Sequence, residues 1–434
     1  MLKNVLLTLI LCIKIDARSE ERGVGMELFR REQYLSKIRG FYHENDIIKV
    51  ITGVRRCGKS SLMEMIKDEL LESGISEERI IYIDLDARKY RKIKTDDQFE
   101  KLVDTLSVSK EMKYLFVDEI QNIENFEEII NAFRNDGDYS IFITGSNSYL
   151  LSGELATKLT GRYVEFELFT LNFNEYLSMK QFYGKTIDNN LNIELDIFIR
   201  EGGFPRAIRF DSIEEKRAYT RSVIDEIFEK DIRKRVKIRN VEVFEAVRGF
   251  IINNFGATMS IQSLQESLAG IGLNVQRATL KRYIDALVNA KILYKCDRFD
   301  MKSKKSLSGE KKYYLADTSF YFALNTDNRI NYGPALENMV YLYARGMNYS
   351  VSVGRIGKLE CDFILRDIEQ NYSYVQVAYT INESIKTEDR EYKPLEMIKD
   401  NYDKYVATTD YLLQKRNGIK HINILEFIKD GCRF

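Results

Sequence analysis

The sequence predicts an α/β protein that begins with a parallel sheet and continues through helical units into a second, C-terminal α/β unit. Short apolar runs alternate with amphipathic helical stretches between residues 47 and 168, as they do in a parallel sheet covered by helices. Residues 170–240 are mostly of helical pattern. From Tyr332 onward a helix, three strand-like segments and a further helical stretch follow one another.

Length and composition limit the class of protein. A chain of 434 residues is too long for one core and predicts two or three domains. Lys+Arg and Asp+Glu both number 66, so the net charge indicates no partner and any nucleic-acid surface must be local. Five scattered cysteines without a CxxC pair, and only two histidines, argue against zinc and favour reduced thiols in a cytoplasmic protein.

Five apolar runs are the candidate strands of the first sheet. They are Ile47–Thr52, Ile80–Leu85, Tyr114–Val117, Ile141–Thr144 and Tyr163–Leu168. The first four are almost continuously apolar, as expected of strands that helices cover on both faces. Helical spacing relates two sets of apolar residues between these strands. The sets are Leu62, Met65, Ile66 and Leu70, and Phe126, Ile129, Ile130 and Phe133.

A glycine-rich loop follows the first strand and opens a helix. Residues 53–60 spell GVRRCGKS, a complete GxxxxGK[ST] match. The glycines let backbone N–H groups face the phosphates of a nucleotide, and the helix N-terminus adds partial positive charge. Lys59 would bridge the phosphates and Ser60 would ligate Mg²⁺. We therefore expect ATP with Mg²⁺, bound by Gly53, Val54, Arg55, Arg56, Cys57, Gly58, Lys59, Ser60 and the adjacent Ser61.

Two further strands end in polar residues at the edge where ligands bind in open α/β sheets. Tyr114–Val117 delivers Asp118, expected to hold Mg²⁺, and Glu119, expected to polarise the attacking water. The next strand ends in Gly-Ser-Asn-Ser, where Ser146 or Asn147 could orient that water as a sensor. A plain turn explains the same residues, so the sensor role and the turn remain alternatives.

These motifs and later ones resemble a family of archaeal and bacterial AAA+ ATPases, in which a P-loop domain precedes a winged helix and a C-terminal domain of unknown function. The resemblance covers nearly all of the chain from Met26 onward. It rests on GVRRCGKSSLM, FVDEIQNI, TGSNSYLLSGELATKLTGRYVEFEL, EGGFP, KYYLAD, ALEN, ECDF and YVQVAY. It implies a P-loop NTPase sheet of AAA+ type with strand order 5-1-4-3-2, counted along the chain.

The resemblance also implies roles for three single residues. It favours Asn147 as the sensor, and it makes Pro205 a lid residue that packs near the adenine. The same Gly-Phe-Pro turn would break a helix in any case. Arg162 becomes a candidate for contact with the γ-phosphate, in its own subunit or in a neighbour of a homo-oligomer. An ion pair with a carboxylate is the alternative for Arg162.

The resemblance divides the chain into an AAA+ P-loop ATPase domain (26–170), a helical lid (171–240), a winged helix (241–325) and a nuclease-like α/β domain (326–434). We interpret residues 1–25 as an extension from a start codon assigned too far upstream. Their apolar run, Val5–Ile13, is too short to span a bilayer. A membrane anchor is the alternative, but no stable membrane association is expected.

A helix and a basic hairpin predict the winged helix. Leu280, Tyr283, Ile284, Leu287 and Val288 form one apolar stripe, which leaves Arg277, Lys281 and Arg282 outward. A strand-like segment, Ile292–Cys296, leads to a basic stretch. That stretch contains Arg298, Lys302, Lys304, Lys305, Lys311 and Lys312. The unit could place a helix and wing on DNA, or it could pack on the nucleotide domain or bind protein.

The last unit resembles the PD-(D/E)xK nuclease fold. Glu337 on a helix and Asp362 on a strand stand in the order of its acidic ligands. Gln376 takes the third position, and Ala378 takes the place of the lysine that positions water. We expect a nuclease fold without nuclease activity. A lysine from elsewhere, such as Lys386, would be needed to restore it.

The leading hypothesis is a Mg²⁺-ATP-dependent molecular switch whose C-terminal units bind a partner, with DNA as one candidate. The alternatives are an ATP-dependent DNA nuclease and a protein-interaction switch that does not bind nucleic acid.

Overall fold

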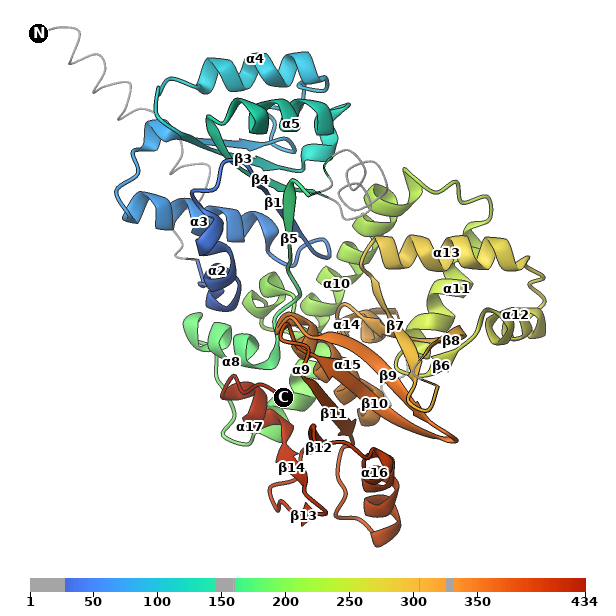
Figure 1. Cartoon of the computed structure of the whole chain (residues 1–434). Coiled ribbons are helices and arrows are strands. Elements are labelled where there is room, and N and C mark those ends of the chain that lie inside the picture. The colour runs from blue at the N-terminus through green and yellow to red at the C-terminus, as the bar shows by residue number, and fades with distance from the viewer. Residues whose placement is uncertain (1–27, 146–158, 160, 304, 325–330) are drawn as a thin grey trace, which may run out of the picture.

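The computed structural model of the chain describes residues 28–145, 159, 161–303, 305–324 and 331–434 (Figure 1). Some of the predictions concern residues outside these ranges: the extension 1–25, the sensor candidates Ser146 and Asn147, and the basic residue Lys304. Within the described ranges, no helix is long and apolar enough to cross a lipid bilayer.

The first sheet contains five parallel strands in the spatial order β2-β3-β4-β1-β5, which confirms the expected order. The strands are β1 (Ile48–Thr52), β2 (Ile80–Asp84), β3 (Lys113–Asp118), β4 (Tyr139–Thr144) and β5 (Tyr163–Glu167). Every residue of β1, β3 and β4 is buried, as predicted. β2 alternates between buried and half-buried residues. The prediction that helices bury both faces of the strand was therefore wrong for β2, because this strand lies at the edge of the sheet.

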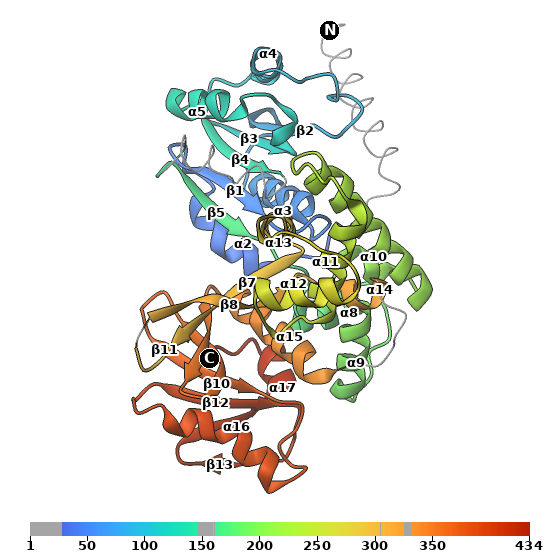
Figure 2. The ribbon, with the colours of Figure 1, turned by 90° about the vertical axis from the view of Figure 1, so that its right-hand side faces the viewer.

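Helices cover both faces of this sheet (Figure 2). One face carries α2 (Glu32–Ile38) and α3 (Lys59–Glu72), and the other carries α4 (Asp96–Leu106) and α5 (Phe126–Asp136). Alternate residues of β1 belong to different cores. Ile51 packs in the core with α3, and Val50 packs in the core with α4 and α5. The alternation follows from the two-residue side-chain period of a strand. Short turns η1 (Arg39–Phe41), η2 (Glu77–Arg79) and η3 (Ile120–Asn122) complete this part.

Residues 173–233 form a helical segment, called the lid below. It comprises α8 (Phe173–Phe182), α9 (Leu191–Glu201), the short helix η4 (Pro205–Arg209), α10 (Ile213–Ile227) and the π-helical turn η5 (Phe228–Arg233). Capping boxes start two of these helices. Asn172 and Glu175 cap α8, and Ser212 and Glu215 cap α10. Each pair satisfies backbone donors that the first helical turn leaves free.

Three helices, a two-residue strand and a hairpin follow the lid. They are α11 (Val241–Asn253), the two-residue strand β6 (Thr258–Met259), α12 (Ile261–Gly270), α13 (Arg277–Asn289), β7 (Leu293–Asp300) and β8 (Lys305–Leu315). The predicted stripe on α13 is confirmed, since Leu280, Tyr283, Ile284 and Leu287 are buried and Val288 is half-buried. Arg277, Lys281 and Arg282 are exposed, also as predicted.

The C-terminal part contributes most strands of a second, nine-stranded sheet of order β13-β14-β12-β11-β10-β9-β7-β8-β6. Its elements are α14 (Ser319–Leu324), α15 (Tyr332–Gly346), β9 (Ser350–Ile356), β10 (Leu359–Arg366), β11 (Tyr372–Val377), α16 (Ile385–Met397), β12 (Asp403–Thr408), β13 (Lys415–Arg416), β14 (Ile419–Asn423) and α17 (Ile424–Lys429). Strand β7 pairs with β9. The sheet therefore runs across the expected domain boundary at 325/326, which local sequence patterns do not reveal.

Glu167, the last residue of β5, ties the first sheet to the later units. Its carboxylate forms ion pairs with Lys291, which precedes β7, and with Arg345 of α15 at 2.8 Å. Both views show the first sheet above the second one (Figures 1 and 2). One acidic side chain thus holds three parts of the chain together.

The Gly-Gly-Phe-Pro segment after α9 has a tertiary explanation. Gly202 has a φ of +77°, and a Cβ added to it would lie 1.8 Å from Oδ1 of Asp317. The other oxygen of Asp317 accepts a 2.8 Å hydrogen bond from the N–H of Gly203. A Cβ on Gly203 would lie 2.3 Å from the carbonyl oxygen of Leu171. Both glycines are therefore required by close backbone packing as well as by the turn.

We predict that Gly202→Ala lowers the free energy of unfolding by about 3 kcal/mol, because the positive φ and the contact with Asp317 both exclude a Cβ. Gly184→Ala is the matched control, since Gly184 has a φ of +65° with nothing within 4 Å of the added Cβ. That change should cost about 1 kcal/mol. Urea unfolding measures both values, and equal losses would contradict the proposed clash with Asp317.

Candidate functional site

The P-loop connects β1 to α3 at the carboxyl edge of the first sheet. Gly53 and Gly58 have φ values of 142° and 110°, in the region that favours glycine. A Cβ on Gly53 would lie 2.1 Å from the carbonyl oxygen of Leu168. Gly58 is the N-cap residue of α3, so the free N–H groups of the first helical turn face this loop. The loop can therefore bind an anion.

Lys59 points back into the P-loop. Its ammonium donates to the carbonyl oxygens of Gly53 at 3.0 Å and Val54 at 3.3 Å. The side chain is buried, and Ser61 lines the cavity next to it. Neutral carbonyls are weaker partners for an ammonium than phosphate oxygens are. The lysine can consequently exchange these carbonyls for the phosphates of a nucleotide.

Ser60 and Asp118 meet across the site. The hydroxyl of Ser60 hydrogen-bonds to the carboxylate of Asp118, which also accepts a hydrogen bond from the hydroxyl of Thr144 at the end of β4. Burial raises the pKa of Asp118, because the ionised carboxylate is poorly solvated there. A cation beside the carboxylate would offset that cost.

Glu119 follows Asp118 in a left-handed backbone conformation with a φ of 57°. Such a conformation is uncommon outside glycine and often occurs at functional sites. Oε2 of Glu119 accepts a hydrogen bond from the side chain of Gln121. Oε1 lies 3.9 Å from Nη1 of Arg55. The carboxylate thus faces the P-loop from the end of β3.

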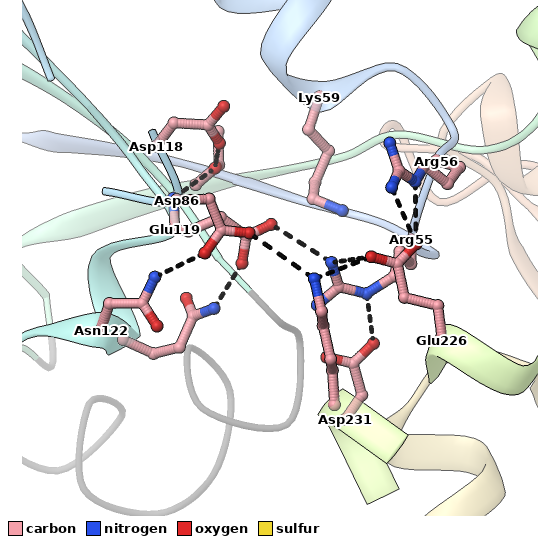
Figure 3. A network of polar contacts seen from close by, with 12 residues as sticks. Arg55, Arg56, Lys59, Asp86, Asp118, Glu119, Asn122, Glu226 and Asp231 are labelled. Carbon is pink, nitrogen blue, oxygen red and sulfur yellow. Dashed lines mark hydrogen bonds and ion pairs between the residues drawn. The ribbon is translucent and has the colours of Figure 1, made fainter. Parts of the chain in front are cut away.

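Arg55 and Arg56 connect the P-loop to the lid (Figure 3). Arg55 donates two hydrogen bonds to Asp231, at 2.9 and 3.0 Å. Arg56, which also has a positive φ of 69°, donates to Glu226 at 3.0 Å. Lys230 pairs with the same Glu226 at 2.9 Å. Sequence reasoning placed both arginines in the loop but missed Asp231 and Glu226, whose only signal is acidic charge on a helical segment.

A cavity of about 450 Å³ lies between the P-loop and the lid. Its polar part is lined by Asp118, Glu119 and the P-loop residues Arg55, Arg56 and Gly58 to Ser61. Apolar side chains also line it, and these are Leu28, Phe29, Met65, Met179 and Tyr183. Pro205 lines the cavity as well, with Cγ 3.9 Å from where a Cβ on Gly58 would lie. The lid proline is therefore close to the P-loop.

Arg31 supports the P-loop from a buried position that sequence reasoning missed. Its guanidinium forms two hydrogen bonds with Glu175, at 2.8 and 2.7 Å. It also donates to the carbonyl oxygens of Cys57 at 3.2 Å and Phe169 at 2.9 Å. The side chain of Cys57 is buried beneath the loop, and burial raises the pKa of its thiol. An arginine next to Arg30 in a charged N-terminal segment carries no local signal for this role.

The structure does not bring Arg162 to its own P-loop. The carbonyl oxygen of Arg162 accepts a hydrogen bond from the N–H of Ile48, at the start of β1. The P-loop begins after Thr52, at the other end of the same strand. The side chain of Arg162 is exposed and donates to Asn131 at 3.2 Å. Contact with the γ-phosphate in the same subunit therefore has no geometric support.

The predicted carboxylates of the C-terminal unit surround a lysine. Glu337 lies on α15 and Asp362 on β10, as predicted. Nζ of Lys312, on β8, lies 3.0 Å from Glu337, 2.8 Å from Glu360 and 3.9 Å from Asp362. Burial raises the pKa values of Glu337 and Asp362. Burial alone would lower the pKa of Lys312, but the carboxylates raise it.

Two residues of the expected basic stretch are therefore not at the surface. Lys312 is buried among the carboxylates, and Arg298 is buried in ion pairs with Glu310 and Glu360. For these two residues the expectation of a basic surface was wrong, because acidic groups from other elements surround them. In the part of the chain that the structure describes, no group of three or more His, Cys, Asp or Glu side chains is arranged to hold a metal ion.

Comparisons with known proteins extend the likeness beyond the P-loop. A family model described as an AAA domain matches residues 45–177, and a model of a domain of unknown function (DUF8612) matches residues 194–330. An uncharacterized protein of Haemophilus influenzae is 33% identical over 406 residues, covering 92% of this chain and 98% of the relative. An uncharacterized protein of Methanocaldococcus jannaschii is also 33% identical, and the match covers 81% of this chain and 79% of the relative. Among solved structures, a Walker-type ATPase of Pyrococcus abyssi is similar over 68% of this chain and 96% of its own, with 15% identity and a TM-score of 0.49.

We predict that Arg31→Met lowers the free energy of unfolding by about 3–5 kcal/mol, because it leaves Glu175 as a buried carboxylate without its partner. Arg30→Met is the matched control, since Arg30 is 47% exposed in its ion pairs with Glu69 and Glu72. The control should lose less than about 1 kcal/mol. Urea unfolding of both variants tests this prediction, and an Arg31→Met protein as stable as the control would contradict it.

Proposed function

Because this chain belongs to the AAA+ ATPase superfamily, in one family with the Haemophilus influenzae relative, we propose that it binds ATP with Mg²⁺ in the P-loop cavity and hydrolyses the ATP. The observation that carries this proposal is the convergence of Lys59, Ser60, Asp118 and Glu119 on one cavity. Phosphoryl transfer requires a loop that binds the phosphates, ligands for Mg²⁺ and a group that positions the attacking water, and these four residues can supply all three.

Each of these side chains has a distinct part in the proposal. Lys59 binds the phosphates once its ammonium leaves the loop carbonyls. Ser60 and Asp118 hold Mg²⁺, since both offer oxygen ligands and a cation offsets the burial of Asp118. When bound, Mg²⁺ neutralises charge on the phosphates. Glu119 polarises the attacking water, and its place beside Asp118 supports this role.

The apolar lining of the cavity fits an adenine. Phe29 and Leu28 come from the N-terminal segment, and Met179 and Tyr183 come from the lid. Pro205 lines the same cavity close to Gly58 of the P-loop, which supports the role that the resemblance gives it. A base bound there would touch the lid while its phosphates touch the P-loop. The nucleotide would then control how the lid closes.

We retain the proposed roles of Arg162 in contacting the γ-phosphate and of Asn147 as the sensor, and different observations support the two roles. The exposed position of Arg162 at the amino edge of the sheet supports contact with the nucleotide of a neighbouring subunit, which requires a homo-oligomer. Asn147 follows β4, whose end carries Thr144 beside Asp118. Its position three residues after Thr144 supports a sensor role for Asn147.

We further propose that residues 241–434 bind a partner and do not cleave DNA. The αβββαβ order from α15 to β12 supports a nuclease-like fold for the last unit. Lys312 supports the absence of cleavage, because its ammonium occupies the space between Glu337, Glu360 and Asp362 where a metal ion would have to bind. The acidic side chains then stabilise the contact between the β7–β8 hairpin and α15.

Two kinds of partner have different support. Arg277, Lys281 and Arg282 on the exposed side of α13 support DNA contact by a winged helix. Exposed apolar side chains support a protein partner instead. These include Tyr411, Leu412 and Ile385, at 60%, 74% and 79% exposure.

For the nucleotide site, we predict that Lys59→Ala weakens ATP binding about a hundredfold or more, because the phosphates lose their charge-assisted hydrogen bonds. Glu119→Gln should bind ATP as the parent does but hydrolyse it about 10²–10⁴ times more slowly. Lys67→Ala is the control, since Lys67 lies on the same helix and pairs with Glu64. Equilibrium binding of labelled ATP and phosphate release test both variants. Parental ATP affinity for Lys59→Ala, or a parental rate of hydrolysis for Glu119→Gln, would show that the residue has no part in the mechanism.

For the C-terminal unit, we predict no DNA cleavage with Mg²⁺ or Mn²⁺, with or without ATP. The fold's lysine position holds Ala378, and Lys312 fills the acidic pocket. A nicking assay on supercoiled DNA provides the measurement. Cleavage that disappears in both Asp362→Ala and Lys312→Met would contradict the prediction and make Lys312 the missing lysine. Cleavage that persists in both variants comes from a contaminant.

A further inference from the structure

Three carboxylates surround the guanidinium of Arg55, two from the lid and one from the end of β3 (Figure 3). Nε and Nη2 donate to both oxygens of Asp231. Nη1 lies 3.6 Å from Oε1 of Glu226 and 3.9 Å from Oε1 of Glu119. The side chain is only 11% exposed. One buried cation thus connects the P-loop, the lid and the proposed catalytic glutamate.

We propose that Arg55 is a positioning residue through which the lid controls Glu119, a role that rests on the proposed ATP hydrolysis. While Asp231 holds the guanidinium on the lid, Glu119 remains available to polarise water. When the lid withdraws Asp231, Arg55 pairs with Glu119 and hydrolysis slows. ATP turnover therefore depends on the position of the lid.

The distances favour Asp231 as the partner of Arg55 in this conformation. Two parallel N–H···O bonds near 3 Å fix both the position and the orientation of the guanidinium. The contact with Glu119 is a single approach at 3.9 Å. A buried arginine requires a counter-charge. If Asp231 is lost, Arg55 therefore moves toward the carboxylates that remain, which include Glu119.

Glu119 is sensitive to such a move because its other oxygen is engaged. Gln121 donates to Oε2, so Oε1, the oxygen that Arg55 faces, is the one through which Glu119 would accept a proton from water. A guanidinium in direct contact with Oε1 would compete with that water. The approach of Arg55 therefore determines whether Glu119 can act.

Asp231 is anchored within the lid by buried neighbours. It lies on η5, a π-helical turn, and such turns occur often at functional sites. Ile227 and Ile232 on either side are buried. Helix α10, which leads into η5, is bound to α14, where Arg221 donates to the carbonyl oxygen of Ala323 at 2.7 Å. A displacement of α14 by a partner of the C-terminal units would thus be transmitted to Asp231.

The test is a double-mutant cycle on ATP hydrolysis by the full-length chain. Asp231→Asn should lower kcat about tenfold or more and change KM less than about threefold, because Lys59, Ser60 and Asp118 do not contact Asp231. In an Arg55→Met background, the same Asp231→Asn change should alter kcat less than about twofold, because no guanidinium remains to be redirected. A purely structural role of Asp231 would lower kcat equally in both backgrounds.

Arg233→Ala is the matched control, since Arg233 lies on the same turn in an exposed ion pair with Glu229. It should hydrolyse ATP at the parental rate. Thermal melting of every variant separates a loss of folding from a loss of kcat. Parental kcat for Asp231→Asn, or an equal loss in both backgrounds, would overturn the role of Arg55 while leaving the proposed ATPase intact. A parent chain without ATP hydrolysis would overturn both.

Discussion

Parallel hydrogen bonding between β1, β4 and β3 brings the carboxyl ends of three strands to one edge of the first sheet, and the nucleotide cavity depends on it. The P-loop follows β1, Asp118 ends β3 and Thr144 ends β4. Parallel strands also require crossover connections, which here are the helices that cover both faces. An antiparallel neighbour would have sent one of these groups to the opposite edge, where Arg162 lies.

Ion pairs of low exposure join the parts of the chain that backbone hydrogen bonds do not join. Arg31 and Glu175 attach the N-terminal segment to the lid, and Arg55 and Asp231 attach the P-loop to the end of the lid. Glu167 attaches the first sheet to both later units. Pairs of this kind add little net stability but penalise any arrangement that leaves one charge buried alone. They therefore favour one relative placement of the parts and can shift between partners.

Much of the fold followed from local patterns. The predicted strands of the first sheet agree with the observed ones to within two residues at each end, because apolar runs between turn residues reflect burial directly, whereas β7 extends four residues beyond the predicted end at Cys296. The stripe on α13 and the order of Glu337, Asp362 and Gln376 were also predictable. The environment of Lys312 was not, since its carboxylate partners lie on α15 and β10 and no sequence pattern relates them to β8.

The P-loop and the Asp118–Glu119 pair at the end of β3 were predictable because each depends on residues that are neighbours in the chain, and the order of the strands was implied by the family resemblance that these motifs carry. Tertiary structure decided which charges meet. It paired Arg55 with Asp231 and buried Lys312 among three carboxylates. It also placed Arg162 at the edge of the sheet opposite to its own P-loop. The sequence around a charged side chain does not indicate whether that side chain is solvated or forms an ion pair, because the partner comes from an element that is distant in the chain.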